Sequence, residues 1–375
     1  MGERELREKL LKEVKRVVVK IGSSLLVEPR VGLKRGYIKD LAREVVVLRQ
    51  KGFEILIVSS GAIAAGMELL GLRSRPSSIS ELQAVAAVGQ GYLMRLYAEA
   101  FEPHGLRVGQ VLLTHEDVKD RRRYLNARST LLTMLSLGVL PIINENDSVA
   151  VEEIRFGDND TLAALVAVLV EAGLLVILTD VEGFFLGGPE GGKLLTLVER
   201  VDKEIRKEAL GPKGPLGTGG MATKVRAAFM ASKAGIHTLV TKGVDPVVLD
   251  RLLRGEVVGT LFLAGPSRLT GKKRWIGFSL KPKGTLLVDQ GAKEAILEKG
   301  KSLLPSGVME VIGKFERGDA VLCVGPDGQE FAKGLVNYSS EELQMIKGRK
   351  TYEIEEILGY KYADEVIHRD NLVVF

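Results

Sequence analysis

Residues 17–24 read VVVKIGSS, a run of valines that ends in Lys20 and passes into a turn of small residues. A continuous run of β-branched residues favours a strand that is buried on both faces of a parallel sheet. Runs of the same kind recur along the chain, namely EILIVSS at 54–60, VLPIIN at 139–144, LLVILTD at 174–180 and HTLVT at 237–241. Longer helical stretches separate them, so the order predicts strands and helices that alternate around a parallel sheet.

The pattern changes after Gly265, where the apolar runs become short and turn signals such as PDG at 326–328 separate them. This pattern is typical of a small, mostly β unit. At 375 residues the chain also exceeds the roughly 250–300 residues at which a single hydrophobic core stops growing. We therefore expect a large α/β domain at 1–265, a linker at 266–280 and a second domain at 281–375.

The composition is that of an ordinary globular protein, with 45% hydrophobic and 27% charged residues. The formal net charge of +5 is spread evenly, because the residues from 266 onward hold 17 Lys+Arg against 16 Asp+Glu. Neither part has the strongly basic balance of a typical nucleic-acid-binding domain. The single cysteine, Cys323, excludes an internal disulfide, and the four scattered histidines predict no metal site.

The first sixteen residues are rich in charge and lack the apolar core of a signal peptide. No later stretch offers about 18 apolar residues without a charge or a turn signal. The sequence therefore predicts a cytoplasmic protein that does not cross a membrane.

Ligands of open α/β sheets bind beyond the carboxyl ends of the strands, and polar residues are dense at the strand ends predicted here. Lys20 and Gly22 could face phosphate oxygens, although a strand that ends in this way is more often structural. In IVSSGAIAAG at 57–66, Ser60 and Gly61 could bind an anion at a helix start. Close helix packing would explain the small residues of this stretch equally well.

The stretch INENDSVAVEEIRFGDNDTLAAL at 143–165 holds two polar clusters, 144–147 and 158–160, and the second directly precedes an apolar helix. One of these residues could cap that helix, but a cap requires only one such side chain. The excess of carboxylates and amides favours a site that binds an amino group or orders cationic side chains.

Two further stretches suggest phosphate binding. TDVEGFF at 179–185 ends an apolar strand, and GTGGMATKVRAA at 217–228 is a glycine loop that leads into a helix with Lys224 in its first turn. The helix macrodipole disfavours a lysine there unless an anion such as phosphate neutralises it. A Walker loop is excluded, because the position that would need its first glycine is Ala295.

Two lysines on separate strand-to-helix connections, two glycine-rich loops and an acidic cluster indicate phosphoryl transfer by positioning and charge stabilisation. No histidine or serine-base pair is apparent that could deprotonate an alcohol. A carboxylate acceptor needs no base, because with a reference pKa near roughly 4 it is already ionised at neutral pH. The sequence therefore predicts a kinase whose acceptor is a carboxylate.

These motifs resemble the amino-acid kinase family. VVVKIGSSLL, IVSSGAIAAGMELLG, LQAVAAVGQGYLM, LPIINENDSVA, GDNDTLAALVA and GTGGMATK follow one another in the family's order over about the first 265 residues. The resemblance implies a three-layer α/β/α sandwich that transfers the γ-phosphoryl group of ATP, with Mg²⁺ bridging the phosphates, to the side-chain carboxylate of L-glutamate. That reaction opens proline biosynthesis, and the resemblance also implies a homo-oligomer with proline as a feedback inhibitor.

The resemblance also assigns roles to individual residues. Lys20 and Lys224 would stabilise the transferring phosphoryl group, and Asp160 would hold their two ammonium groups in place. The glutamate site would consist of Ser60, Asp147 and Asn159. The ATP site would consist of Lys20, Thr179, Asp180, Thr218, Gly219, Gly220, Met221, Ala222, Thr223 and Lys224.

The chain departs from the family in two places. FFLGGPEGG at 184–192 stands where the family usually has a YTADP-like segment beneath the nucleotide, so no adenine contact carries over. About a dozen residues more than the family needs precede the first strand, and the resemblance gives them no function.

The second domain, 281–375, resembles a PUA domain, a fold known for RNA binding. Its near-neutral charge favours a structural or regulatory role over RNA binding. Two alternatives to a glutamate kinase stay open at this point. One is a related kinase that acts on aspartate, acetylglutamate, carbamate or a nucleoside monophosphate, and the other is a PUA-based RNA-binding protein.

Overall fold

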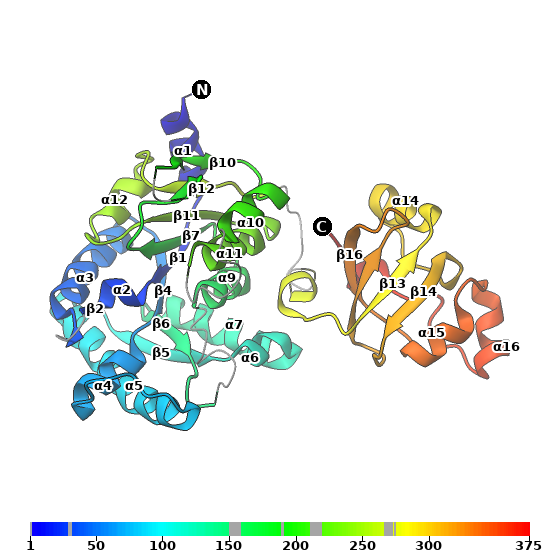
Figure 1. Ribbon diagram of the computed structural model, residues 1–375, viewed down its shortest axis with the longest axis horizontal. Coiled ribbons are helices and arrows are strands. Elements are labelled where there is room, and N and C mark those ends of the chain that lie inside the picture. The colour runs from blue at the N-terminus through cyan, green and yellow to red at the C-terminus, as the bar shows by residue number, and fades with distance from the viewer. Residues whose placement is uncertain are drawn as a thin grey trace. The chain divides into compact units, whose positions relative to one another are not determined.

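The computed structural model describes residues 2–28, 32–149, 159–188, 191–210, 220–265, 273 and 275–375. The chain divides into two compact units, Met1–Ser267 and Arg268–Phe375 (Figure 1). Most of the predicted linker, namely 266–272 and 274, lies outside the described residues.

The first unit is built on one eight-stranded sheet. Its strands are β1 (Arg16–Ile21), β4 (Glu54–Ser59), β5 (Val108–Leu113), β6 (Leu140–Glu145), β7 (Leu174–Thr179), β10 (Leu197–Val198), β11 (His237–Lys242) and β12 (Thr260–Phe262). Their order across the sheet is β10-β12-β11-β7-β1-β4-β6-β5. Every predicted apolar run forms a strand, and the pairs are parallel except β11–β12, which is antiparallel. The sheet is thus mixed at one end, where a wholly parallel sheet was predicted.

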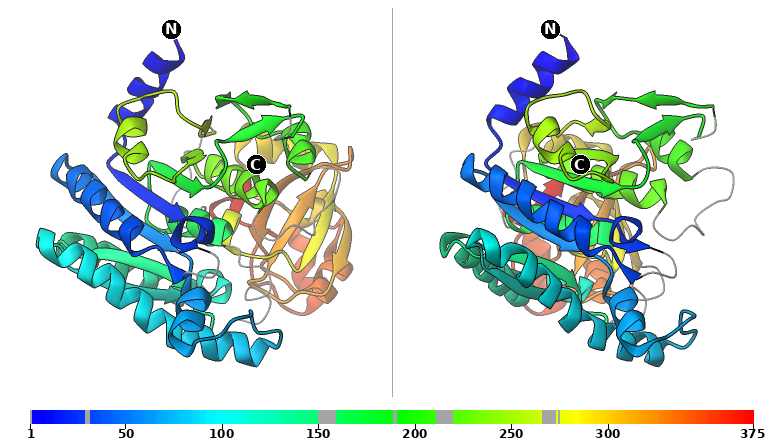
Figure 2. Two further views of the ribbon diagram at one scale, coloured as in Figure 1. Left: turned by 60° about the vertical axis from the view of Figure 1, so that its left-hand side comes forward. Right: turned by 90° about the vertical axis from the view of Figure 1, so that its left-hand side faces the viewer.

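Helices cover both faces of this sheet. They are α1 (Glu3–Lys12), α2 (Ser23–Leu26), α3 (Arg35–Gln50), α4 (Ala62–Leu70), α5 (Ile79–Phe101), α6 (His115–Lys119), α7 (Arg121–Ser136), α9 (Asn159–Leu169), α10 (Lys203–Leu210), α11 (Met221–Lys233) and α12 (Val248–Leu253). Helices α3, α5 and α12 lie on one face and α7, α9 and α11 on the other (Figure 1), and Figure 2 shows the first face from the front. The predicted three-layer α/β/α sandwich is confirmed.

Two short hairpins extend from the sandwich. One pairs β2 (Val27–Glu28) with β3 (Gly32–Leu33), and the other pairs β8 (Phe184–Leu186) with β9 (Lys193–Leu195). The second hairpin contains the predicted departure at 184–192, of which residues 189 and 190 lie outside the described part of the chain.

Helix α9 is buried along its whole length, because it packs on β1, β4, β6 and β7 and is covered by α11. Its sequence NDTLAALVAVL is apolar on every side after the first turn, as a helix in the interior requires. Its opening residues Asn159 and Asp160 are therefore carried into the interior, where polar groups need partners.

The second unit is a mostly β domain, as predicted. Its five-stranded sheet has the order β14-β13-β15-β16-β17 and consists of β13 (Gly284–Val288), β14 (Val308–Gly313), β15 (Ala320–Val324), β16 (Glu330–Leu335) and β17 (Leu372–Val374). The α-helices described in this unit are α14 (Gln290–Lys299), α15 (Ser340–Ile346) and α16 (Ile354–Leu358). The predicted PDG turn joins β15 to β16, and Gly328 has a φ of +70° there.

Cys323 lies in the core of this second unit and is completely buried. Burial raises the pKa of its thiol to about 12, so the sulfur stays protonated at neutral pH. In the described part of both units, no helix is long and apolar enough to span a membrane.

Candidate functional site

The strands β7, β1, β4 and β6 are parallel neighbours, so their carboxyl ends meet at one edge of the sheet, the carboxyl edge. Thr179 ends β7, Lys20 is the penultimate residue of β1, and Ser60 follows β4. Asn144 is the penultimate residue of β6. The structure therefore brings the polar residues that the sequence singled out in these four stretches to one edge.

Lys20 and Lys224 meet at the same carboxylate. Lys20 Nζ lies 2.8 Å from Asp160 Oδ1, and Lys224 Nζ lies 3.1 Å from Asp160 Oδ2. The three residues are only 7%, 5% and 2% exposed. Thr223 Oγ1 donates a further hydrogen bond of 2.7 Å to Asp160 Oδ2. One carboxylate thus fixes a lysine from the sheet and a lysine from α11 in the same small region.

The charge of Asp160 follows from its surroundings. Burial by itself would raise the pKa of this carboxyl, but the ammonium groups of Lys20 and Lys224 and the hydroxyl of Thr223 outweigh that effect and hold the pKa below its usual range. Asp160 therefore stays ionised at neutral pH. In the resting protein it separates two like charges that would otherwise repel each other at close range.

A chain of buried amides lies beside this centre. Asn159 Nδ2 donates to Asn144 Oδ1 at 3.0 Å and to Ser60 Oγ at 2.9 Å, with the carbonyl oxygen of Ser59 at 3.1 Å. Asn144 Nδ2 donates in turn to Gln90 Oε1 at 2.9 Å. Because the amide nitrogen of Asn159 is used in this way, its oxygen is the atom left to accept from a ligand. Ser60 Oγ accepts within the chain, so its own O–H can donate.

Asp147 lines a cavity of about 260 Å³ at the carboxyl end of β6, together with Gln90, Glu145 and residues of α5 and β5. Burial raises the pKa of Asp147 to about 6, with a further contribution from the negative charge of Glu145 and a partial offset from Arg75. A cationic group in this cavity would relieve the unfavourable burial of negative charge. The cavity therefore suits a small ligand that carries an ammonium group.

Of the predicted ATP residues besides Lys20, Thr179 and Asp180 lie at the end of β7 and 220–224 lie at the start of α11. Thr179 is buried, and its Oγ1 donates to Asp180 Oδ1 at 3.0 Å. Gly220 precedes α11 with an extended backbone and no side-chain cap, so the first N–H groups of the helix, those of Met221 and Ala222, can bind an anion. Thr218 and Gly219 lie outside the described residues, as does Asp158 of the acidic cluster.

Gly66 of the 57–66 stretch follows the packing interpretation, whereas Gly61 directly precedes α4 with a φ of +106°. A Cβ atom on Gly66 would lie 1.9 Å from the carbonyl oxygen of Val85, and one on Gly89 would lie 1.9 Å from that of Ala62. The helices α4 and α5 can approach each other this closely only because both positions are glycine. Ser60, in contrast, takes part in the amide chain of the site.

Gln90 is the residue of the site that the sequence did not single out. It lies on the buried stripe of α5 with Leu82, Val85, Ala86 and Gly89. A polar residue in such an apolar stripe needs a buried partner, and this was the available signal. Among the described residues, no group of three or more His, Cys, Asp or Glu side chains could hold a metal ion.

Comparisons with known proteins agree with this fold. The model of the amino acid kinase family matches residues 15–242, and that of the PUA domain matches residues 284–358. The chain is 51% identical over 372 residues to the glutamate 5-kinase of Pelobacter propionicus, a match that covers 98% of this chain and 100% of that protein.

Two further relatives have the same name. The glutamate 5-kinase of Syntrophotalea carbinolica is 50% identical, and the match covers 98% of this chain and 100% of that protein. The glutamate 5-kinase of Pseudomonas putida is 51% identical, and the match covers 96% of this chain and 98% of that protein. Among solved structures, the carbamate kinase from Giardia lamblia bound to AMP-PNP is 18% identical over 67% of this chain and 99% of its own, with a TM-score of 0.48, too low to support an argument about the site. By its family match and by relatives of about half identity over nearly its full length, the chain belongs to the amino acid kinase family.

Proposed function

We propose that this chain transfers the γ-phosphoryl group of ATP to the side-chain carboxylate of L-glutamate, forming glutamyl 5-phosphate and ADP as the first step of proline biosynthesis. The observation that carries the proposal is the meeting of Lys20 and Lys224 at Asp160. Relatives named glutamate 5-kinase, at about 50% identity over nearly the whole chain, support glutamate as the acceptor.

The acceptor carboxylate is already ionised, so the reaction requires no general base. A bond forms between a carboxylate oxygen and the γ-phosphorus while the bond to the bridging oxygen of ADP breaks. Negative charge spreads over the transferring group in the transition state. Lys20 and Lys224 would stabilise that charge from fixed positions, and Asp160 would hold both ammonium groups in place before ATP binds.

Glutamate recognition follows from the hydrogen-bonding polarity of the amide chain. The hydroxyl of Ser60 would donate to a carboxylate of the substrate, and Asn159 Oδ1 would accept from its ammonium group. Asp147 would pair with the same ammonium group from the neighbouring cavity. The three side chains would therefore recognise an amino acid by its two charged groups: Ser60 would bind a carboxylate, and Asn159 and Asp147 would bind the ammonium group.

Thr179, Asp180 and the segment 218–224 would bind ATP. The uncapped start of α11 and the two buried lysines fit a polyphosphate, because both attract negative charge. The described residues hold no metal cage, and Asp160 is already engaged with both lysines. Mg²⁺ would therefore be held mainly by the phosphates of ATP, as is usual for this ion, and would neutralise part of their charge.

A hydroxamate assay with ATP tests the acceptor. Acyl phosphates react with hydroxylamine, so glutamate, aspartate, acetylglutamate and carbamate can be compared in parallel, and ADP release can be followed with nucleoside monophosphates. Glutamate should give the dominant signal. No product with glutamate, but turnover with another acceptor, would assign the chain to a different reaction within the family.

A homo-oligomer and proline as a feedback inhibitor stay predictions that rest on the family resemblance, and a cytoplasmic location stays a prediction from the sequence. The domain limits 1–265, 266–280 and 281–375 also stay predictions, which rest on the change of sequence pattern after Gly265. For the PUA domain we favour a structural or regulatory role. Tight, sequence-selective retention of RNA by the full chain at moderate salt would instead favour an RNA-binding function.

A further inference from the structure

The proposed function leaves helix α1 without a role, and the family match begins only at residue 15. Helix α1 nevertheless carries a completely buried arginine, Arg7. Arginine is among the residues least often buried in full, and removing its charge from water is costly unless hydrogen bonds replace the lost solvation. The contacts of Arg7 therefore show what the helix holds.

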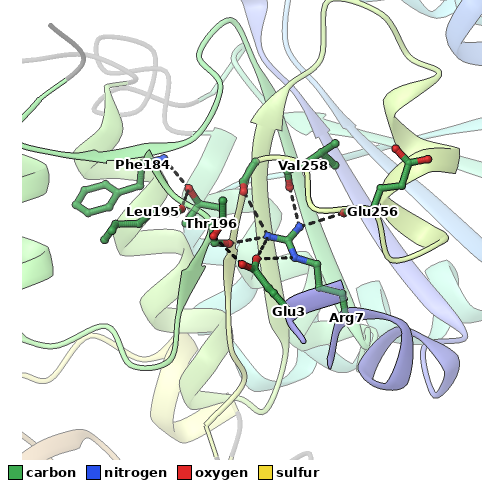
Figure 3. A network of polar contacts seen from close by, with 9 residues as sticks. Glu3, Arg7, Phe184, Leu195, Thr196, Glu256 and Val258 are labelled. Carbon is green, nitrogen blue, oxygen red and sulfur yellow. Dashed lines mark hydrogen bonds and ion pairs between the residues drawn. The ribbon is translucent and has the colours of Figure 1, made fainter. Parts of the chain in front are cut away.

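The guanidinium of Arg7 is surrounded by backbone carbonyl groups (Figure 3). Nη1 donates to the carbonyl oxygens of Val258 at 2.8 Å and Glu256 at 3.3 Å, and Nη2 donates to that of Thr196 at 2.6 Å. Glu3 Oε1 lies 2.9 Å from Nη2 and balances the charge. Glu3 Oε2 also accepts from Thr196 Oγ1 at 2.8 Å. Two residues of α1 thus fasten two separate segments of backbone, 196 and 256–258.

Both segments adjoin Thr260, one along the chain and the other through a hydrogen bond. Its Oγ1 donates to the carbonyl oxygen of Leu195 at 2.6 Å and accepts from the N–H of Phe184 at 2.7 Å. Leu195 precedes Thr196, and Thr260 lies two residues beyond Val258. The contacts of Arg7 therefore flank the hydroxyl group that fixes the backbone of Phe184.

Phe184 ends the short loop 179–184, which begins at the carboxyl end of β7. It follows Asp180 by four residues, is 1% exposed and packs on Phe262 with ring centroids 6.4 Å apart. The preceding Gly183 is just as confined, because a Cβ atom there would lie 2.5 Å from Thr260 Oγ1. The loop 179–184 is therefore fixed by β7 at one end and by Thr260 at the other.

We propose that Arg7 is a positioning residue for the nucleotide side of the active site: through the segments 195–196 and 256–260 it fixes the Phe184 end of the loop that carries Thr179 and Asp180. The inference rests on the ATP role proposed for those two residues. It gives the N-terminal helix a function, because the helix acts as a clamp on a loop more than 170 residues away in sequence.

Substrate selectivity separates this role from general stabilisation of the sheet edge. Arg7→Lys keeps a positive charge but loses the planar fork that reaches both segments. We expect KM for ATP to rise about tenfold, a change within the range for losing charge-assisted hydrogen bonds, while KM for glutamate changes less than about twofold. Arg4→Ala is the matched control, since Arg4 lies on the same helix but is exposed and pairs only with Glu8 among the described contacts. Equal KM values for ATP in Arg7→Lys and the unsubstituted chain would overturn the proposal.

Thr260→Val tests the second link and remains available if Arg7→Lys folds poorly. Valine has the shape of threonine without the hydroxyl group, so the substitution should raise KM for ATP on its own. In the double variant the two effects should not multiply, because both act through Phe184. Fully independent effects on KM for ATP would contradict the coupling.

Amide hydrogen exchange at Phe184 gives a readout that does not depend on activity. Its N–H should exchange faster in Arg7→Lys and in Thr260→Val than in the unsubstituted chain or in Arg4→Ala. Unchanged exchange in Arg7→Lys would overturn the clamp. If the unsubstituted chain fails to turn over ATP, the proposed function fails, whereas the exchange at Phe184 still decides whether Arg7 fixes this loop.

Discussion

Asp160 joins two ammonium groups that come from different layers of the sandwich, Lys20 from the sheet and Lys224 from α11. Removing one partner of a buried ion pair usually costs about 3–5 kcal/mol, because the charge left behind has no compensation. The carboxylate therefore stabilises the resting structure as well as the arrangement that we propose receives the phosphoryl group.

Lys224→Ala tests the catalytic role of this centre. Because the contact matters most when charge develops on the transferring group, kcat should fall by a factor on the order of 10²–10³ while KM for glutamate changes little. Steady-state kinetics with both substrates measures the two effects separately. Lys39→Ala, an exposed position on α3, is the control. An unchanged kcat would remove Lys224 from the catalytic residues.

Asp147 predicts a pH dependence of glutamate binding. With a pKa of about 6, its carboxyl is ionised above that pH and neutral below it, and only the ionised form can pair with the ammonium group. We expect kcat/KM for glutamate to fall as the pH drops through about 6 at saturating ATP. Asp147→Asn should lower kcat/KM at high pH and abolish this step. A step that persists in the variant would assign the titration to another group.

At the scale of the elements, the amide chain on the proposed glutamate side combines residues from four places: α5 supplies Gln90, β6 supplies Asn144, the β4–α4 connection supplies Ser60 and α9 supplies Asn159. The direction of each hydrogen bond fixes which atom faces the ligand. Gln90 Oε1 accepts a hydrogen bond from Asn144 Nδ2, and this orients Asn144 Oδ1 toward Asn159, from which it accepts.

Gln90→Met should therefore impair glutamate binding from outside the predicted contact residues. It keeps the length of the side chain but removes the acceptor, and it leaves the amide nitrogen of Asn144 unpaired at a cost of about 1–3 kcal/mol. KM for glutamate should rise about tenfold and KM for ATP should stay the same. Gln50→Met, at the exposed end of α3, serves as the control. Parallel changes in both KM values would indicate general destabilisation instead.

The strands of the sheet's centre were predictable because each is one continuous apolar run, and their polar ends marked the site. The direction of β12 was not, since Thr260–Phe262 is too short for any pattern to distinguish parallel from antiparallel pairing. Lys20, Asp160 and Lys224 were found from residue types at element ends and from family resemblance. Arg7 was missed because a charged residue on an amphipathic helix is normally exposed.

At the scale of the whole chain, each compact unit has its own hydrophobic core. Leu343 of α15 is fully buried in the second core, and Leu252 of α12 in the first. Truncation of such a leucine to alanine typically costs about 2–5 kcal/mol. The two cores can therefore be weakened one at a time.

We expect heat unfolding of the full chain to deviate from a single two-state transition, as is usual for proteins with two domains. Leu343→Ala should lower the Tm of one component and leave kcat and both KM values unchanged. Leu252→Ala should lower the Tm of the other component. Differential scanning calorimetry checks both shifts, and one sharp transition that moves as a whole in either variant would contradict separate folding units.

The buried Cys323 allows opening of the second unit to be measured from the rate at which its thiol is labelled. Its sulfur is the only thiol of the chain, and in the folded state it is both covered and protonated. A thiol-reactive dye should therefore label the native protein only as fast as the five-stranded sheet opens, and Leu343→Ala should accelerate the labelling whereas Leu252→Ala should not. Labelling at the same rate in all three proteins would mean that the sulfur is reached without opening. If the rates differ as expected, the opening free energy of the second unit can be followed during catalysis through its natural cysteine, without introducing a new one by substitution.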